Sequence, residues 1–241
     1  PTGRHYPGIA DLIAAAIRDV PGLCAEFEAS QAWSSLPFAV IDFETTGVDS
    51  SVDRILEIGI VAFERGRVLF REGLLVNPGI PVPEESRAIH GITDEELAGA
   101  PRFEEVLPKV LELLHGRLPV AYNAQFDRGF LHAEMRRVQG ALSDDGSLPP
   151  AMRRDVVWLD PLVWAREILK EQKSRKLGDV AAHFNVPLEQ AHRAAGDAEA
   201  TGHVLLNLAP QMPAAYGEVV RLQGRYGAFQ EADLNQWKKF R

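Results

Sequence analysis

A pair of acidic residues at the end of an apolar strand is the feature that most constrains this chain. Residues 38–41 form a short apolar run, and Thr46-Gly47 supplies the turn that ends it. Because side chains alternate between the two faces of a strand, Asp42 and Glu44 point to the same face. Two such carboxylates repel each other and lose hydration, which is unfavourable unless a cation lies between them. The pattern predicts a divalent-cation site, and strand-end acids that face water are the alternative.

Composition limits the classes of protein to which the chain can belong. Its 241 residues, 46% of them hydrophobic, can bury a large core. The 26 basic and 34 acidic residues give a net charge of -8, so there is no general basic footprint for nucleic acid. An enzyme that holds a short piece of nucleic acid through metal ions is still compatible with this charge. The single Cys24 excludes an internal disulfide framework, and we expect a cytoplasmic protein with no membrane span.

The periodicity of apolar residues predicts an α/β domain with a mixed β-sheet, three antiparallel strands followed by parallel ones, flanked by helices. A turn signal at Arg65-Gly66 joins the second and third strands. The sequence Thr93-Asp94-Glu95-Glu96 is a capping box for a short helix. The other predicted strands are 54–64, 67–76, 118–122 and 156–159, and the other predicted helices are 103–114, 126–138, 161–169, 177–184 and 194–208.

Three regions are expected along the chain. Residues 1–35 form an N-terminal extension, in which the apolar spacing predicts two short helices separated at Pro21-Gly22. Residues 36–209 form the main domain, and residues 210–241 form a C-terminal extension. The sequence of neither extension indicates a partner.

Two further carboxylates occupy the starts of predicted helices. Asp127 lies just after the strand that ends at Asn123, and Asp197 lies one turn into the helix that follows His192-Arg193. Taken singly, each acid has a simple alternative role, because a carboxylate in the first helical turn interacts favourably with the helix dipole. That interaction is worth less than about 1 kcal/mol at an exposed site.

Taken together, these segments resemble the DEDD-type, DnaQ-like 3′ to 5′ exonucleases. Asp-Phe-Glu-Thr-Thr-Gly at 42–47 resembles the first motif of that family, Asn-Ala-Gln-Phe-Asp at 123–127 the second, and His-Arg-Ala-Ala-Gly-Asp-Ala at 192–198 the third. His192 precedes Asp197 by five residues, which is the spacing of the histidine subclass, the type found in the DNA polymerase III epsilon subunit. The resemblance spans residues 37–208 and implies a ribonuclease H-like fold.

The resemblance also implies roles for five residues. Asp42 would bridge two divalent cations, Mg²⁺ or Mn²⁺, while Glu44 and Asp197 complete the first site and Asp127 holds the second, partly through water. His192 would be the general base, since an imidazole can accept a proton near neutral pH. The chemistry of the ligands agrees, because a cage of carboxylates suits hard cations rather than zinc.

Several residues are expected to contact the terminal nucleotide because of the same resemblance. The turn after the first strand would place backbone amides and a hydroxyl near it, and an apolar side chain would wedge against its base. For Phe126, a position in the core is the alternative. These candidates are Thr45, Thr46, Gly47, His90, Ile92, Asn123 and Phe126.

Two basic segments are further candidates for contacts with the phosphate backbone. One is the pair Arg153-Arg154, and the other contains Lys170, Lys173, Arg175 and Lys176. A solvated charged face is the alternative for both. Glu57, an acid within an otherwise apolar strand, has no role that we can assign from the sequence.

The sequence therefore favours a metal-dependent 3′ to 5′ exonuclease that releases 5′ mononucleotides from single-stranded or frayed DNA 3′ ends. Such an enzyme is either free-standing or a proofreading partner of a DNA polymerase. An exoribonuclease of the same fold is one alternative, although the Glu-Thr-Thr-Gly sequence favours DNA. A catalytically silent module that binds a polymerase is another, and the complete set of four acids and one histidine argues against it.

Overall fold

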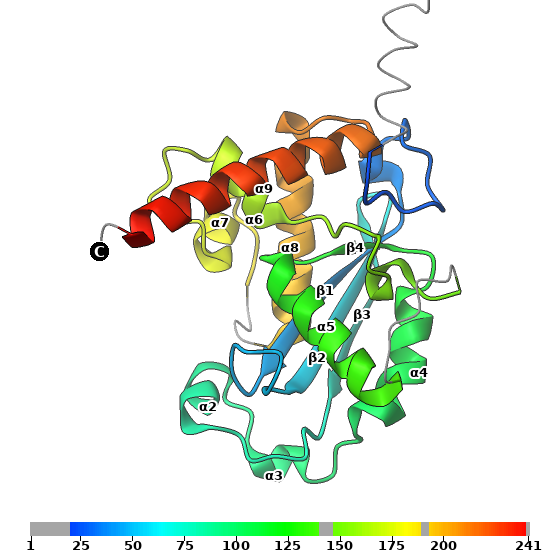
Figure 1. Ribbon diagram of the computed structural model, residues 1–241, viewed down its shortest axis with the longest axis vertical. Helices are drawn as coiled ribbons and strands as arrows, with labels where there is room; N and C mark the ends of the chain where they lie inside the picture. Colours follow the sequence, from blue (N-terminus) through cyan, green and yellow to red (C-terminus); the bar gives the residue numbers. More distant parts are fainter. Residues whose placement is uncertain (1–19, 140–146, 189–192, 240–241) are drawn as a thin grey trace, which may run out of the picture.

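The computed structural model describes residues 20–139, 147–188 and 193–239. A short 3₁₀-helix and a three-stranded meander come first, and within these ranges they are followed by helices with one further strand among them (Figure 1). In chain order the elements are η1 Trp33–Ser35, β1 Phe38–Thr45, β2 Ile55–Glu64, β3 Arg67–Leu75, α2 Glu84–His90, α3 Asp94–Leu97, α4 Phe103–Leu114, β4 Leu118–Val120, α5 Ala124–Gln139, η2 Pro150–Met152, α6 Pro161–Ile168, α7 Leu177–His183, α8 Ala194–Leu208, η3 Ala209–Gln211 and α9 Tyr216–Lys239.

The four strands form one mixed sheet in the order β3-β2-β1-β4. The first three strands are antiparallel, and β4 is parallel to β1, so the predicted mixed sheet is confirmed. The strand predicted at 156–159 is wrong in extent, because it is reduced to a single parallel bridge between Leu159 and Val120. Val157, within the same predicted strand, donates its N–H to Gly22 O instead of to the sheet, and this bond directs the segment away from the sheet.

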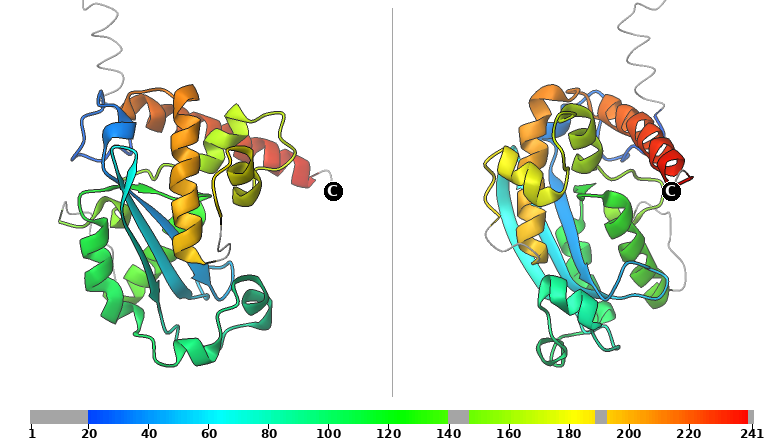
Figure 2. Two further views of the ribbon diagram at one scale, coloured as in Figure 1. Left: turned by 180° about the vertical axis from the view of Figure 1, so that it is seen from behind. Right: turned by 90° about the vertical axis from the view of Figure 1, so that its left-hand side faces the viewer.

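Helices cover both faces of the sheet, with α8 on one side and α4 and α5 on the other (Figure 2). The alternation of side chains along β1 explains this arrangement. Phe38 and Val40 pack into the cluster that contains α8, whereas Ala39 and Ile41 pack into the cluster that contains α4 and α5. Asp42 has the same parity as Phe38 and Val40, so its side chain projects to the α8 side of the sheet.

Glycines allow α8 to lie very close to β2. A Cβ on Gly59 would lie 2.2 Å from the carbonyl carbon of Ala194, and a Cβ on Gly202 would lie 2.2 Å from the Phe63 ring. Gly59 is the residue opposite Asp42 in the antiparallel ladder. The missing side chain therefore makes room for the first turn of α8 directly beside Asp42.

The described part of the N-terminal extension is not the helix that the sequence predicted. Residues 20–32 form turns, and the Cys24 N–H donates to the Tyr216 hydroxyl at 2.9 Å. The side chain of Glu26 is held by Arg153 at 2.9 Å. These contacts with distant segments override the local helical spacing. The first predicted helix lies in residues 1–19, outside the described residues.

The segment expected to be a C-terminal extension forms α9, which lies across the end of the molecule above α6 (Figure 1). Tyr216, Val219 and Val220 at its start are buried in the same cluster as α8. Phe229 and Leu234 in its second half are 59% and 47% exposed. Within the described ranges, no helix is long and apolar enough to cross a membrane.

The close contact between α8 and β2 predicts opposite effects for two glycine substitutions. Gly202→Ala should lower the free energy of unfolding by about 1–3 kcal/mol, because its methyl group collides with Phe63. Gly224→Ala in α9 is the control, since a Cβ there meets no atom within 4 Å. It should raise the free energy by about 0.5–1 kcal/mol through helix propensity. Urea denaturation followed by circular dichroism measures both, and equal effects would contradict the account.

Candidate active site

Three carboxylates converge at the end of β1. Asp42 and Glu44 project from the strand, and Asp197 reaches them from the first turn of α8. One oxygen from each lies within 4.8 Å of the others. All of these donors are oxygen atoms and all three side chains are partly buried, which is the ligand set that hard divalent cations prefer. The residues therefore fit the metal site that the sequence predicted.

Asp127 approaches the same strand from the first turn of α5. Its Oδ1 accepts the Phe43 N–H at 3.1 Å, at a point on β1 beyond the last residue of β4, Val120. The side chain thus takes the place of a neighbouring strand. Burial raises the pKa of Asp127 well above its usual range, although the bonds to backbone N–H groups partly oppose that shift.

The carboxylates perturb one another strongly. Burial raises the pKa of Asp42 well above its usual range, and the charges of Asp127, Asp197 and Glu44 raise it further. Burial also raises the pKa of Glu44 to about 7, with Asp197 the largest charge effect. Each acid is therefore easier to protonate than in water, and a bound cation relieves the same repulsion at neutral pH.

Glu57 has a clear structural role that the sequence did not reveal. Its buried carboxylate accepts three hydrogen bonds from Arg193, at 2.9–3.3 Å, and one from the Ala194 N–H. It thereby fixes the start of α8, one turn before Asp197. The available signal was its position in an otherwise apolar strand, opposite Glu44 in the ladder.

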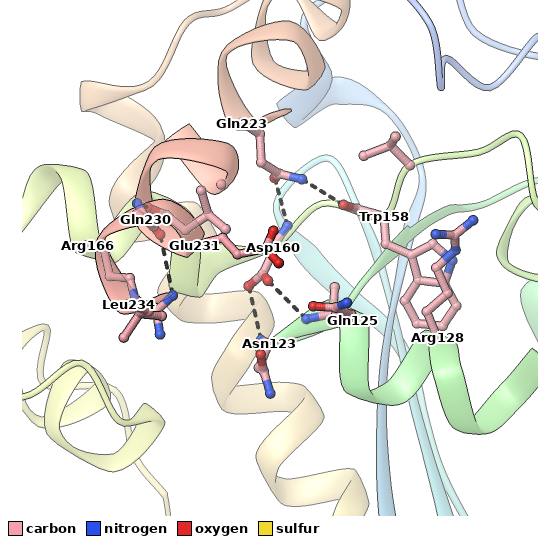
Figure 3. Close-up of a pocket in the computed structure, with 14 residues that line it drawn as sticks. Asn123, Gln125, Arg128, Trp158, Asp160, Arg166, Gln223, Gln230, Glu231 and Leu234 are labelled. Carbon is pink, nitrogen blue, oxygen red and sulfur yellow. Dashed lines mark hydrogen bonds between the residues drawn. The ribbon is translucent and has the colours of Figure 1, made fainter. Parts of the chain in front are cut away.

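A second anchor lies at the start of α5 (Figure 3). The buried carboxylate of Asp160 accepts the N–H groups of Asn123 and Ala124, both at 3.0 Å. The Asp160 N–H in turn donates to the side-chain oxygen of Gln223 in α9. This chain of hydrogen bonds connects α9 to the helix that carries Asp127. The sequence showed Asp160 only as the start of a helix.

The predicted substrate-binding turn adjoins the carboxylates, and its polar groups bond within the turn. The Thr45 hydroxyl donates to Gly47 O, and the Thr46 hydroxyl donates to Asp53. The Thr46 N–H donates to Arg54 O. The turn is therefore rigidly built, and its contact with a nucleotide stays a prediction.

The other predicted substrate contacts differ in their exposure. Ile92 is 1% exposed and belongs to a small core cluster, so it can wedge against a base only if this segment moves. His90 is also buried, and its Nδ1 accepts the Ile92 N–H. Asn123, directly before α5, has a φ of 65°, and Phe126 packs against Phe130. The predicted base, residue 192, lies outside the described residues.

The basic segment near residue 170 lies partly beside Asn123. Arg175 and Lys176 line a pocket of about 600 Å³ together with Asn123. Lys170 pairs with Glu167 at 3.4 Å. A phosphate contact from this segment stays a prediction.

Comparison with known proteins identifies the family. A sequence model of the family described as Exonuclease (RNase_T) matches residues 39–205, which include all four carboxylates. This chain belongs to that exonuclease family. The predicted resemblance is thereby confirmed, and the carboxylates lie in an exonuclease domain.

Curated relatives of this exonuclease domain are much longer proteins. DNA polymerase III PolC-type of Thermotoga petrophila is 33% identical over 196 residues, which make up 81% of this chain and 14% of the polymerase. The PolC-type polymerase of Clostridium perfringens is 34% identical over 168 residues, 70% of this chain and 11% of the polymerase. The chain thus spans a small part of the length of these relatives.

Solved structures share the fold of this exonuclease domain. Exonuclease X in complex with 5′ overhanging duplex DNA has a TM-score of 0.56 and 24% identity, and the match covers 76% of this chain and 99% of that one. The nuclease domain of 3′hExo, described as a DEDDh family member bound to rAMP, has a TM-score of 0.60 and 15% identity, with coverages of 73% and 92%. The predicted ribonuclease H-like fold is confirmed.

The repulsion among the carboxylates predicts how stability depends on pH and metal. A folded-state pKa of about 7 for Glu44, against 4.5 normally, means that metal-free protein loses stability as pH rises through this window. At pH 8 in EDTA, Asp42→Asn should therefore melt at a higher temperature than wild type. With Mn²⁺ the order should reverse, because wild type gains about 2.7 kcal/mol when the cation is at 100 times its dissociation constant.

Thermal denaturation at pH 5.5 and pH 8, with EDTA or Mn²⁺, measures this reversal. Asp233→Asn in the exposed part of α9 is the matched control and should behave as wild type. A metal-free Asp42→Asn protein that is less stable than wild type at pH 8 would contradict the assigned repulsion.

Proposed function

We propose that this chain is a metal-dependent 3′ to 5′ exonuclease that acts on DNA and releases 5′ mononucleotides. The observation that carries the proposal is the convergence of Asp42, Glu44 and Asp197 within 4.8 Å, with Asp127 bonded to the same strand. A domain with only a structural role would have no need for four converging acids, three of which, Asp42, Glu44 and Asp127, have pKa values raised by burial and by neighbouring charges.

We assign the following roles to the residues as part of this proposal. Two divalent cations, Mg²⁺ or Mn²⁺, would activate a water and stabilise the leaving 3′ oxygen. Glu44 and Asp197 would hold one cation, Asp127 the other, and Asp42, which is within electrostatic reach of Asp127 and Asp197, would contact both. His192 would accept the proton of the attacking water. The anchors Glu57 and Asp160 keep the two helices in register with β1.

The relatives support DNA as the substrate and a polymerase as a partner. The matched region belongs to DNA polymerases in the curated relatives, and a solved structure of the same fold contains duplex DNA. Proofreading beside a polymerase, or the trimming of DNA ends as a free-standing enzyme, would use the same site. Another solved structure of this fold shows a 3′-exonuclease that recognises the 3′ end of a histone mRNA stem-loop, so RNA is the second candidate substrate.

Incubation with 5′-labelled single-stranded DNA and matched RNA tests the proposal. With Mg²⁺ or Mn²⁺ the products should form a ladder that shortens from the 3′ end, and EDTA should stop it. DNA should be degraded faster than RNA. Asp42→Asn should abolish the ladder, and the exposed control Asp233→Asn should leave it unchanged. No degradation with either metal would favour a silent binding module, and faster degradation of RNA would make the chain an exoribonuclease.

The proposed general base has its own expected result. His192→Ala should lower the turnover rate roughly 10²- to 10⁴-fold, because the attacking water loses its proton acceptor. The loss should shrink as pH rises and hydroxide replaces the imidazole. His115→Ala, an exposed histidine after α4, is the control. Rate profiles from pH 6 to pH 9 that coincide for wild type and His192→Ala would remove this role.

A further inference from the structure

A strongly basic groove lies along the outward side of α5, and we call it the α5 groove. It has a volume of about 390 Å³ and begins at the first turn of α5, the turn that carries Asp127. Among the described residues, its lining contains three arginines and no carboxylate. The lining residues are Ser50, Gln125, Arg128, Gly129, His132, Arg136 and Arg154.

The charge of the α5 groove is unusual for this acidic chain, which has 34 acidic and 26 basic residues. Within the described ranges, no carboxylate pairs with Arg128, Arg136 or Arg154. The acids closest in sequence are engaged elsewhere. Asp127 bonds the Phe43 N–H on β1, Glu134 is buried against Arg54 on another side of α5, and Asp155 pairs with Arg153. Three unpaired cations in one groove repel each other, and an anion relieves that repulsion.

Arg128 is held in place by the fold, whereas Arg136 and Arg154 are exposed at the groove surface. Arg128 is partly buried, and its guanidinium donates to Arg154 O at 2.7 Å, while its Nε has no hydrogen-bond partner among the described residues. Behind it, His132 is buried and bonds Ala151 O. Burial lowers the pKa of His132 to about 4, and the charges of the three arginines contribute. The groove therefore has a preformed positive potential.

The two arginines of the predicted basic pair Arg153-Arg154 lie in different surroundings. Arg153 is 4% exposed and is bound to Glu26 on the N-terminal turn, so it does not face the groove. Arg154 is exposed and lines the groove. Only one of the two predicted phosphate contacts is thus available to a ligand.

The position of the α5 groove relates it to the active site. Gln125 and Arg128 flank Asp127 on the same turn of α5, with Asp127 facing β1. Ser50 belongs to the loop that follows β1, and its carbonyl is bonded by Arg137 at 2.8 Å, which fixes that loop against α5. From Arg128 to Arg136 the helix rises about 12 Å. That distance equals the rise of about three to four nucleotides of one strand.

We propose that the α5 groove binds the phosphate backbone of the nucleic acid a few nucleotides from the scissile bond. This inference rests on the proposed function and adds a second binding site to it. This backbone belongs either to the continuation of the cleaved strand or to the complementary strand of a duplex. Arginine suits this ligand because its planar guanidinium bonds two phosphate oxygens at once.

The salt dependence of hydrolysis tests the site directly. The double variant Arg136→Ala with Arg154→Ala should raise KM for oligonucleotides and leave kcat unchanged. The slope of log(kcat/KM) against log salt should become shallower by about 1.4 for single strands or about 1.8 for duplexes, since each lost phosphate contact removes about 0.7 or 0.9. Lysine at both positions should largely restore the slope, because the charge is kept. Arg67→Ala, on the hairpin at the far end of the sheet, is the matched control.

Substrate length and structure distinguish the two strands. If the cleaved strand occupies the groove, the variant effect should appear with single strands once they exceed about five nucleotides. If the complementary strand occupies it, the effect should appear only with duplexes. An unchanged slope in the alanine double variant with both kinds of substrate would overturn the proposal.

A small substrate separates this inference from the proposed function. The p-nitrophenyl ester of thymidine 5′-monophosphate reaches only the carboxylate site. The alanine and the lysine double variants of Arg136 and Arg154 should therefore both hydrolyse it as wild type does. If wild type hydrolyses neither this ester nor DNA, the proposed function fails. Binding of labelled oligonucleotides, measured by fluorescence anisotropy with the Asp42→Asn protein and its Arg136→Ala, Arg154→Ala derivative, then still tests the groove. Equal affinities in that comparison would overturn it.

Discussion

The repulsion between carboxylates at the end of β1 is the constraint on which the rest of the structure depends. Asp42, Glu44 and Asp197 have carboxylate oxygens within 4.8 Å of one another, and burial together with the neighbouring charges raises the pKa values of Asp42 and Glu44. Carboxylates that repel one another stay this close only when other contacts of the folded chain hold them in place. Gly59 lets α8 approach the strand, and Glu57 fixes the first turn of that helix through Arg193.

The opposite side of the site depends on a different set of contacts. Asp127 stands where a longer β4 would pair, and Asp160 fixes the start of its helix through two backbone N–H groups. Gln223 of α9 holds Asp160, so the last helix of the chain contributes to the geometry of the active site. A segment with no catalytic residue is thereby part of the same cooperative unit as the carboxylates.

Much of this arrangement could be predicted from sequence because it is local. Strand alternation placed Asp42 and Glu44 on one face. Helical spacing predicted the first and last residues of α4 and α8 correctly. What could not be predicted rests on contacts between distant segments: the turns around Cys24, held by Tyr216 and Arg153, the α9 anchor, and the burial of Ile92. Helix α2, which begins after Pro83 with no side-chain cap, was not predicted because it has little local signal.

Anomalous diffraction from crystals soaked with Mn²⁺ and a nucleoside 5′-monophosphate would locate the cations directly. We expect two Mn²⁺ peaks, one bounded by Asp42, Glu44 and Asp197 and the other between Asp42 and Asp127, with the phosphate of the nucleotide on both. Peaks only at other surface carboxylates, or a nucleotide bound away from this end of β1, would contradict the assignment of the four acids as one catalytic site.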